Sequence, residues 1–150
     1  MTDHDTGAGW ADHKGGGQDA LLLLARVLLG AIFVQSGFGK LMGLGGFIAG
    51  LEHQGVPMAT VLGTLGACVE CFGGLAVMLG AWTRCAAILL AIFTVVATLI
   101  AHRFWEAAPE ARMMQQTQFM KNLAIIGGYV ALVAAGGGRF GFDGYRRSRS

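Results

Sequence analysis

Charged residues are scarce in this sequence. Asp, Glu, Lys and Arg make up 13% of its 150 residues, against roughly 25% in a typical soluble domain, whereas hydrophobic residues make up 54%. So few charges cannot cover the surface that a soluble domain of this length exposes to water. We therefore expect one domain whose outer surface faces lipid in part.

Cysteine is also rare, and three cysteines in an apolar chain exclude the disulfide framework of a small secreted protein. Cys68 and Cys71 have the Cys-x-x-Cys spacing, but they lie inside an apolar segment, where a thiolate is disfavoured. We interpret them as small packing residues and leave their redox activity open. The sequence has no nucleotide loop, Ser-His-Asp arrangement, haem motif or metal-binding helix motif. We therefore expect no metal site and assign no catalytic residue.

Four apolar stretches predict transmembrane helices, at residues 20–42, 57–79, 83–101 and 119–135. Their lengths of 17 to 23 residues suit a bilayer, since a helix needs about 20 residues to cross the hydrocarbon core. All four are apolar on nearly every face, whereas helices of soluble bundles carry a polar stripe. The sequence therefore predicts an all-α polytopic membrane protein, with a four-transmembrane-helix bundle over residues 20–138 and tails at residues 1–19 and 139–150.

The two tails differ in charge. Residues 1–19 are acidic and glycine-rich, unlike the basic start of a cleaved signal peptide, and we expect them to be disordered. The C-terminal tail is basic, which is typical of a cytoplasmic anchor beside anionic lipid, and elsewhere no basic face indicates nucleic-acid binding. The terminal side of the bundle carries six Lys and Arg residues against four on the other side. This bias predicts that both termini lie in the cytoplasm.

Glu70 is the most informative polar residue because it lies near the middle of the second span. A charge inside the membrane costs about 2.5–3.5 kcal/mol on insertion scales, so it usually faces protein or water. Glu70 shares a helix face with small residues, which favour close helix packing; these are Gly63, Gly66, Gly73 and Gly74. We expect Glu70 either to pair with a cation, for which Arg26 is the candidate, or to be protonated. The pair could equally serve only to fix the helix register.

Arg26 and Lys40 mark the two ends of one stripe on the first span, with Gly30 and Gly37 between them. We expect Arg26 to have a buried partner, while Lys40 either joins the polar cluster or extends to the interface. His102, Lys121 and Asn122 lie at helix ends on the same predicted side as Lys40. Together they predict an outward-facing vestibule, with a solvated ring of interfacial residues as the alternative.

Several short motifs, in this order and spacing, resemble the DoxX family of small bacterial four-helix membrane proteins. The resemblance runs from about Leu21 to Asp143 and is carried by Arg26, Gly37-Phe38-Gly39-Lys40-Leu41, Gly55-Val56-Pro57, Glu70 with Gly73-Gly74, Gly80 with Thr83-Arg84, His102, Lys121-Asn122, and Gly136-Gly137-Gly138 with Asp143. It implies a bacterial inner-membrane protein associated with quinone-linked sulfur oxidation or with membrane oxidoreductase assemblies. Quinone is accordingly the expected cofactor, and a membrane-associated oxidoreductase is the expected partner.

Three functions remain open at this point. The first is a membrane subunit of a redox system that binds quinone through Glu70 and Arg26 and receives electrons from a partner, since the sequence has no electron carrier of its own. The second is a transporter of a small solute or protons, which a chain this short could form only as a homo-oligomer. The third is a non-catalytic scaffold in which the polar cluster locks the bundle.

Overall fold

The structure, a computed structural model, describes residues 9–149, with side chains from residue 16 onward. Over that range it contains helices and no strand. The helices are α1 (Gly9–Met42), α2 (Leu44–His53), α3 (Ala59–Leu79), α4 (Thr83–Ala101), α5 (Pro109–Ala135) and α6 (Phe142–Arg147). Four segments are long and apolar enough to cross a membrane: Gly16–Met42, α3, α4 and α5. The predicted all-α fold with four transmembrane helices is confirmed.

Two of the long helices begin earlier than the sequence analysis placed them. α1 begins at Gly9, so residues 9–19 are helical where a disordered tail was expected; residues 1–8 lie outside the described residues. Extending an existing helix adds one hydrogen bond per residue without a new nucleation step, which lets the apolar span continue through a glycine-rich stretch. α5 begins at Pro109 rather than near residue 119. Proline is favoured at the first helical position, where no intrahelical N–H bond is needed.

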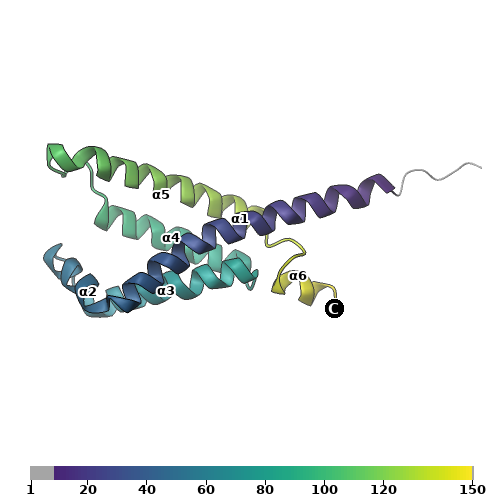
Figure 1. Cartoon of the computed structure of the whole chain (residues 1–150), viewed down its shortest axis with the longest axis horizontal. Coiled ribbons are helices and arrows are strands. Elements are labelled where there is room, and N and C mark those ends of the chain that lie inside the picture. Colours follow the sequence, from purple (N-terminus) through teal and green to yellow (C-terminus); the bar gives the residue numbers. More distant parts are fainter. Residues whose placement is uncertain (1–8, 150) are drawn as a thin grey trace, which may run out of the picture.

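The long helices pack as two pairs (Figure 1). α1 lies along α3 and α4 lies along α5, while contacts between α3 and α4 join the pairs. α2 covers one end of α3, and we call this end of the bundle the α2 end. α6 and the start of α1 lie at the opposite end, the α6 end. The terminal segments therefore share one side, as four spans require.

Glycines allow α1 and α3 to approach each other closely. A methyl group added at Gly37 would lie 2.8 Å from the carbonyl oxygen of Ala67, and one added at Gly74 would lie 2.8 Å from that of Gly30. The remaining glycines of the predicted packing set face side chains of neighbouring helices: Gly63 faces Leu51, Gly66 faces Phe93, and Gly73 faces Leu90. Small residues are what close helix contacts inside a bilayer need.

Tyr129 of α5 ties the two helix pairs together at the centre. It is fully buried, its ring packs edge-on against Phe33 of α1 at 5.5 Å between centroids, and its hydroxyl donates to the carbonyl oxygen of Leu29 at 3.3 Å. Large apolar side chains instead cover the outer faces, where Leu28 and Phe72 are 59% and 64% exposed. An apolar exterior around a small core is the arrangement that lipid requires.

Candidate functional site

A buried ion pair joins α1 to α3 near the α2 end. The Nζ atom of Lys40 lies 2.5 Å from Oε1 of Glu70, and the Glu70 side chain is only 5% exposed. The Lys40 ammonium also lies 5.2 Å from the centroid of the Phe47 ring of α2. Glu70 is therefore paired with a cation inside the bundle, as one of the sequence alternatives required.

The prediction that Arg26 is the partner of Glu70 was wrong. Arg26 precedes Lys40 by 14 residues on α1, which separates them by about 21 Å at 1.5 Å per residue. Of these two α1 residues, Lys40 is the one that contacts Glu70. Arg26 is instead buried at the α6 end, where its Nη2 donates to the carbonyl oxygen of Phe140. Its partner is therefore the backbone of the C-terminal segment, while its Nε and Nη1 atoms are buried without a hydrogen-bond partner among the described residues.

The predicted polar residues other than Arg26 come together around one cavity. This polar cavity has a volume of about 190 Å³ and lies between α1, α3, α4 and α5. Its polar lining residues are Ser36, Lys40, Glu70, Thr94, His102, Lys121 and Asn122. Two lysines and one glutamate line it, so the cavity favours a ligand group that is anionic or rich in lone pairs.

Hydrogen bonds from α4 and α5 hold the rim of the polar cavity in place. Asn122 Nδ2 donates to Thr98 Oγ1 at 2.9 Å, and Thr98 Oγ1 donates to the carbonyl oxygen of Thr94 at 2.6 Å. His102 Nδ1 lies 2.9 Å from Gln115 Oε1. The sequence analysis missed both threonines, although their i, i+4 spacing in an apolar span places them on one helix face.

A second, apolar pocket lies on the other side of the ion pair. It has a volume of about 330 Å³ and is formed by α2, α3 and α4, with Phe47, Leu51, Val69 and Ile100 among its lining residues. Lys40 and Glu70 line both this apolar pocket and the polar cavity, together with Phe93, Ala97 and Ala101. The ion pair therefore stands at the junction of a polar and an apolar space.

One carboxylate oxygen of Glu70 takes no part in the ion pair. Glu70 Oε2 is buried and has no hydrogen-bond partner among the residues that the structure describes. A buried polar atom without a partner carries a desolvation cost of about 1–3 kcal/mol, so it marks a place for a ligand or water. Lys40 can donate and Glu70 can accept at the same point. The site can thus bind a polar head group and accommodate an apolar body beside it.

The cysteines stand apart from this site. Cys68 and Cys71 are half-buried, Cys85 is exposed, and all three are free. The backbone of Cys71 packs against Gly37 of α1, as a small residue at a close helix contact does. Among the residues from 16 to 149, no group of three or more His, Cys, Asp or Glu side chains is placed to hold a metal ion.

Comparison with known proteins agrees with this architecture. The family model described as DoxX matches residues 21–103, which include Lys40 of α1 and the whole of α2, α3 and α4. Both residues of the ion pair therefore lie within the match. The chain belongs to the DoxX family. Two DoxX-like relatives from Escherichia coli K12 extend the match beyond α4. The inner membrane protein YphA is 30% identical over 129 residues, covering 86% of this chain and 92% of YphA. The inner membrane protein YqjF is 33% identical over 126 residues, covering 84% of this chain and 92% of YqjF. No solved structure matches the chain.

Proposed function

We propose that this DoxX family member is an inner-membrane subunit that binds a quinone at the Lys40–Glu70 pair and serves a membrane-associated oxidoreductase. The observation that carries the proposal is the position of the pair, which borders both the polar cavity and the apolar pocket. A quinone has a polar head group on an apolar body, so it presents the same two characters. The inner-membrane location rests on the two relatives named above.

The residues fit such a ligand in three respects. The Lys40 ammonium can donate a hydrogen bond to a carbonyl oxygen of the head group, and the unpartnered Glu70 Oε2 can accept one from a hydroxyl. The apolar pocket offers a wall of hydrocarbon next to them. Gly63 and Gly66 also line the pocket, where their lack of side chains makes room for Leu51 and Phe93 of the same wall.

When bound, the quinone would supply the capacity to take up two electrons and two protons. Glu70 would exchange a proton at the head group through Oε2, the carboxylate oxygen that has no hydrogen-bond partner among the described residues. Lys40 would hold the head group oxygen and stabilise negative charge there. His102 and Lys121 line the same polar cavity as Glu70. Electrons would come from the oxidoreductase partner.

The test is retention of quinone during purification from native membranes. Ala97 borders both spaces, so Ala97→Leu would fill their junction while leaving the ion pair intact. Val95, two residues away on α4, is 42% exposed and lines neither space, which makes Val95→Leu a matched control. We expect quinone, measured by extraction and chromatography, to co-purify with wild type and Val95→Leu, and to fall at least tenfold in Ala97→Leu and Glu70→Gln.

Two results would contradict the proposal. If wild-type protein retains no quinone and does not alter quinone reduction in membranes, the site binds something else. If Ala97→Leu retains as much as wild type, the quinone lies elsewhere on the protein. Solute or proton flux through liposomes containing purified wild-type protein, abolished in Glu70→Gln, would favour the transporter reading of the polar cavity instead.

A further inference from the structure

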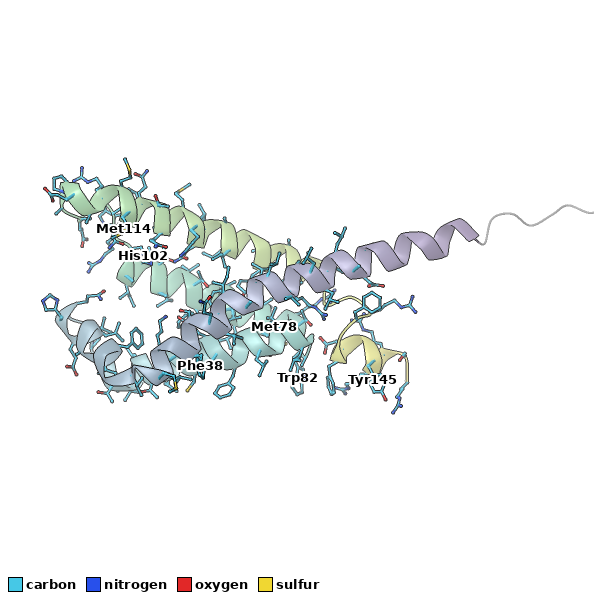
Figure 2. All side chains as sticks on the ribbon, viewed as in Figure 1. Phe38, Met78, Trp82, His102, Met114 and Tyr145 are labelled. Carbon is cyan, nitrogen blue, oxygen red and sulfur yellow. The ribbon has the colours of Figure 1, made fainter. Side chains whose placement is uncertain are left out.

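Three arginines face one pocket at the α6 end, away from the proposed quinone site. The pocket has a volume of about 450 Å³ and lies between the start of α4, the end of α5 and α6. Figure 2 shows its Trp82 at the same end as Tyr145 of α6, far from His102 and Met114. Its lining residues are Trp82, Thr83, Arg84, Cys85, Gly136, Gly137, Asp143, Arg146 and Arg147.

Asp143, the one carboxylate that lines this arginine pocket, already accepts hydrogen bonds from the start of α4. Asp143 Oδ1 accepts from the Trp82 N–H at 2.9 Å, and Oδ2 accepts from the Thr83 N–H at 2.8 Å and from Thr83 Oγ1 at 2.9 Å. Asp143 thus serves as an N-terminal cap for α4 supplied from a distant part of the chain. Its single negative charge stands against three guanidinium groups, so the pocket keeps an excess of positive charge.

Arg84 is held in position at the pocket wall. Its Nη2 donates to the carbonyl oxygen of Ala134 at 3.4 Å, and its guanidinium passes the backbone of Gly136. A methyl group at Gly136 would lie 3.5 Å from Arg84 Nε, and the φ angle of 79° at Gly136 favours glycine. A guanidinium that is already placed loses less conformational freedom when it binds an anion.

The chemistry of the pocket selects a phosphate group attached to an apolar molecule. Guanidinium groups match the oxygens of phosphate in bidentate fashion. Trp82 and Phe142 lie beside the arginines, 64% and 49% exposed, with 6.2 Å between their ring centroids. Exposed aromatic residues at the end of transmembrane helices lie at the head-group level of a bilayer. Basic pockets between such helices bind anionic lipid head groups.

We infer that Arg84, Arg146 and Arg147 form a binding site for the head-group phosphate of an anionic phospholipid. The phosphate occupies the pocket between α4 and α6, and the acyl chains run along the apolar outer face of α4 beside Trp82. This lipid also holds α6 against the bundle, since Arg146 and Arg147 belong to α6 and Arg84 to α4. The site is separate from the Lys40–Glu70 pair and does not depend on the proposed quinone chemistry.

The experiment measures binding of phosphatidylglycerol to the full-length, delipidated protein in detergent by native mass spectrometry, with phosphatidylcholine as the zwitterionic reference of zero net charge. The test variants are Arg84→Gln and the double variant Arg146→Gln/Arg147→Gln. The matched control is Arg139→Gln/Arg149→Gln, which removes the same charge from residues that do not line the pocket. We expect affinity for phosphatidylglycerol to fall about fivefold for each pocket arginine removed, and the control to stay within about twofold.

Two further arms separate the possible readings. Arg84→Lys keeps the charge but loses the bidentate fork, so it should recover only part of the affinity lost in Arg84→Gln. Inorganic phosphate at about 50 mM should not displace the lipid, because phosphate lacks the apolar contacts at Trp82. Equal loss in the control would overturn the site in favour of a diffuse charge effect. Displacement by phosphate alone would show a free phosphate site instead of a lipid site.

Discussion

Lys40 and Glu70 form a contact of 2.5 Å between the last turn of α1 and the middle of α3. The contact fixes the depth of α1 against α3, because a shift of one helical turn would separate the two side chains. It also leaves Glu70 Oε2 buried and without a hydrogen-bond partner among the described residues. The same pair can therefore both set the helix register and present a binding group, and these two roles predict different effects of mutation.

Breaking one side of the pair should cost more than removing both. Lys40→Met leaves Glu70 buried without a cation, and we expect this to lower the free energy of unfolding by about 3 kcal/mol. The double variant Lys40→Met/Glu70→Leu replaces the pair with apolar groups and should recover most of that loss. Unfolding in mixed detergent, followed by circular dichroism, measures both. A double variant less stable than either single variant would show that the two residues act independently.

Glycine packing between α1 and α3 gives a prediction with an internal control. Gly37→Ala would place a methyl group 2.8 Å from the carbonyl oxygen of Ala67, so the helices must separate, at a cost of about 1–3 kcal/mol. Gly39, on the same helix, has nothing within 4 Å of an added methyl group. Gly39→Ala should therefore stabilise the protein slightly, by up to about 1 kcal/mol, because alanine favours the helix. Thermal unfolding midpoints that shift equally in both variants would contradict this packing.

Much of this architecture was predictable from residue type and spacing. The four spans follow from length and hydropathy. The sequence also groups His102, Lys121 and Asn122 on one side of the bundle, although Lys121 and Asn122 lie in the middle of α5 and not at its start as expected. The partner of Glu70 did not follow. A helix wheel gives the direction of a side chain around the axis, but the depth of α1 relative to α3 depends on how their glycines pack.

Two other features depended on tertiary contacts that local sequence does not encode. α2 contains Gly45, Gly46 and Gly50, which disfavour an isolated helix. It forms against α3, where the absence of a side chain at Gly63 makes room for Leu51. The partner of Arg26 is a carbonyl group in a loop, at Phe140, and a backbone acceptor leaves no trace in residue identity.

Asp143 should make the stability of the α6 end depend on pH. Partial burial alone would raise the pKa of this carboxyl, but the hydrogen bonds from Thr83 and Trp82 and the charge of Arg147 outweigh it, so the pKa lies below its usual value. A lowered pKa means that Asp143 contributes stability above its unfolded pKa of about 3.9. That contribution disappears as the pH falls through the lower, folded value.

Asp143→Asn isolates this effect. At pH 7 we expect the variant to be about 1 kcal/mol less stable than wild type, because α4 loses a charged N-terminal cap. Below pH 3.9 the difference should shrink as wild-type Asp143 becomes protonated. Hydrogen exchange at the Asp143 N–H, which donates to the Gly80 carbonyl at 2.9 Å, reports the docking of α6 directly. A difference between variant and wild type that does not change with pH would contradict the role of the ionised carboxyl.

The orientation of the bundle remains a prediction, and Cys85 allows a direct test. Cys85 is exposed in the first turn of α4 at the α6 end, where it lines the arginine pocket. If both termini are cytoplasmic, as the distribution of Lys and Arg predicts, this thiol faces the cytoplasm. A charged, membrane-impermeant maleimide should label Cys85 in inside-out vesicles of the variant Cys68→Ala/Cys71→Ala and leave it unlabelled in right-side-out vesicles. The control is the same variant with Cys85→Ser, which should not be labelled in either preparation. Labelling only in right-side-out vesicles would invert the topology, and it would also move the proposed lipid site to the opposite leaflet.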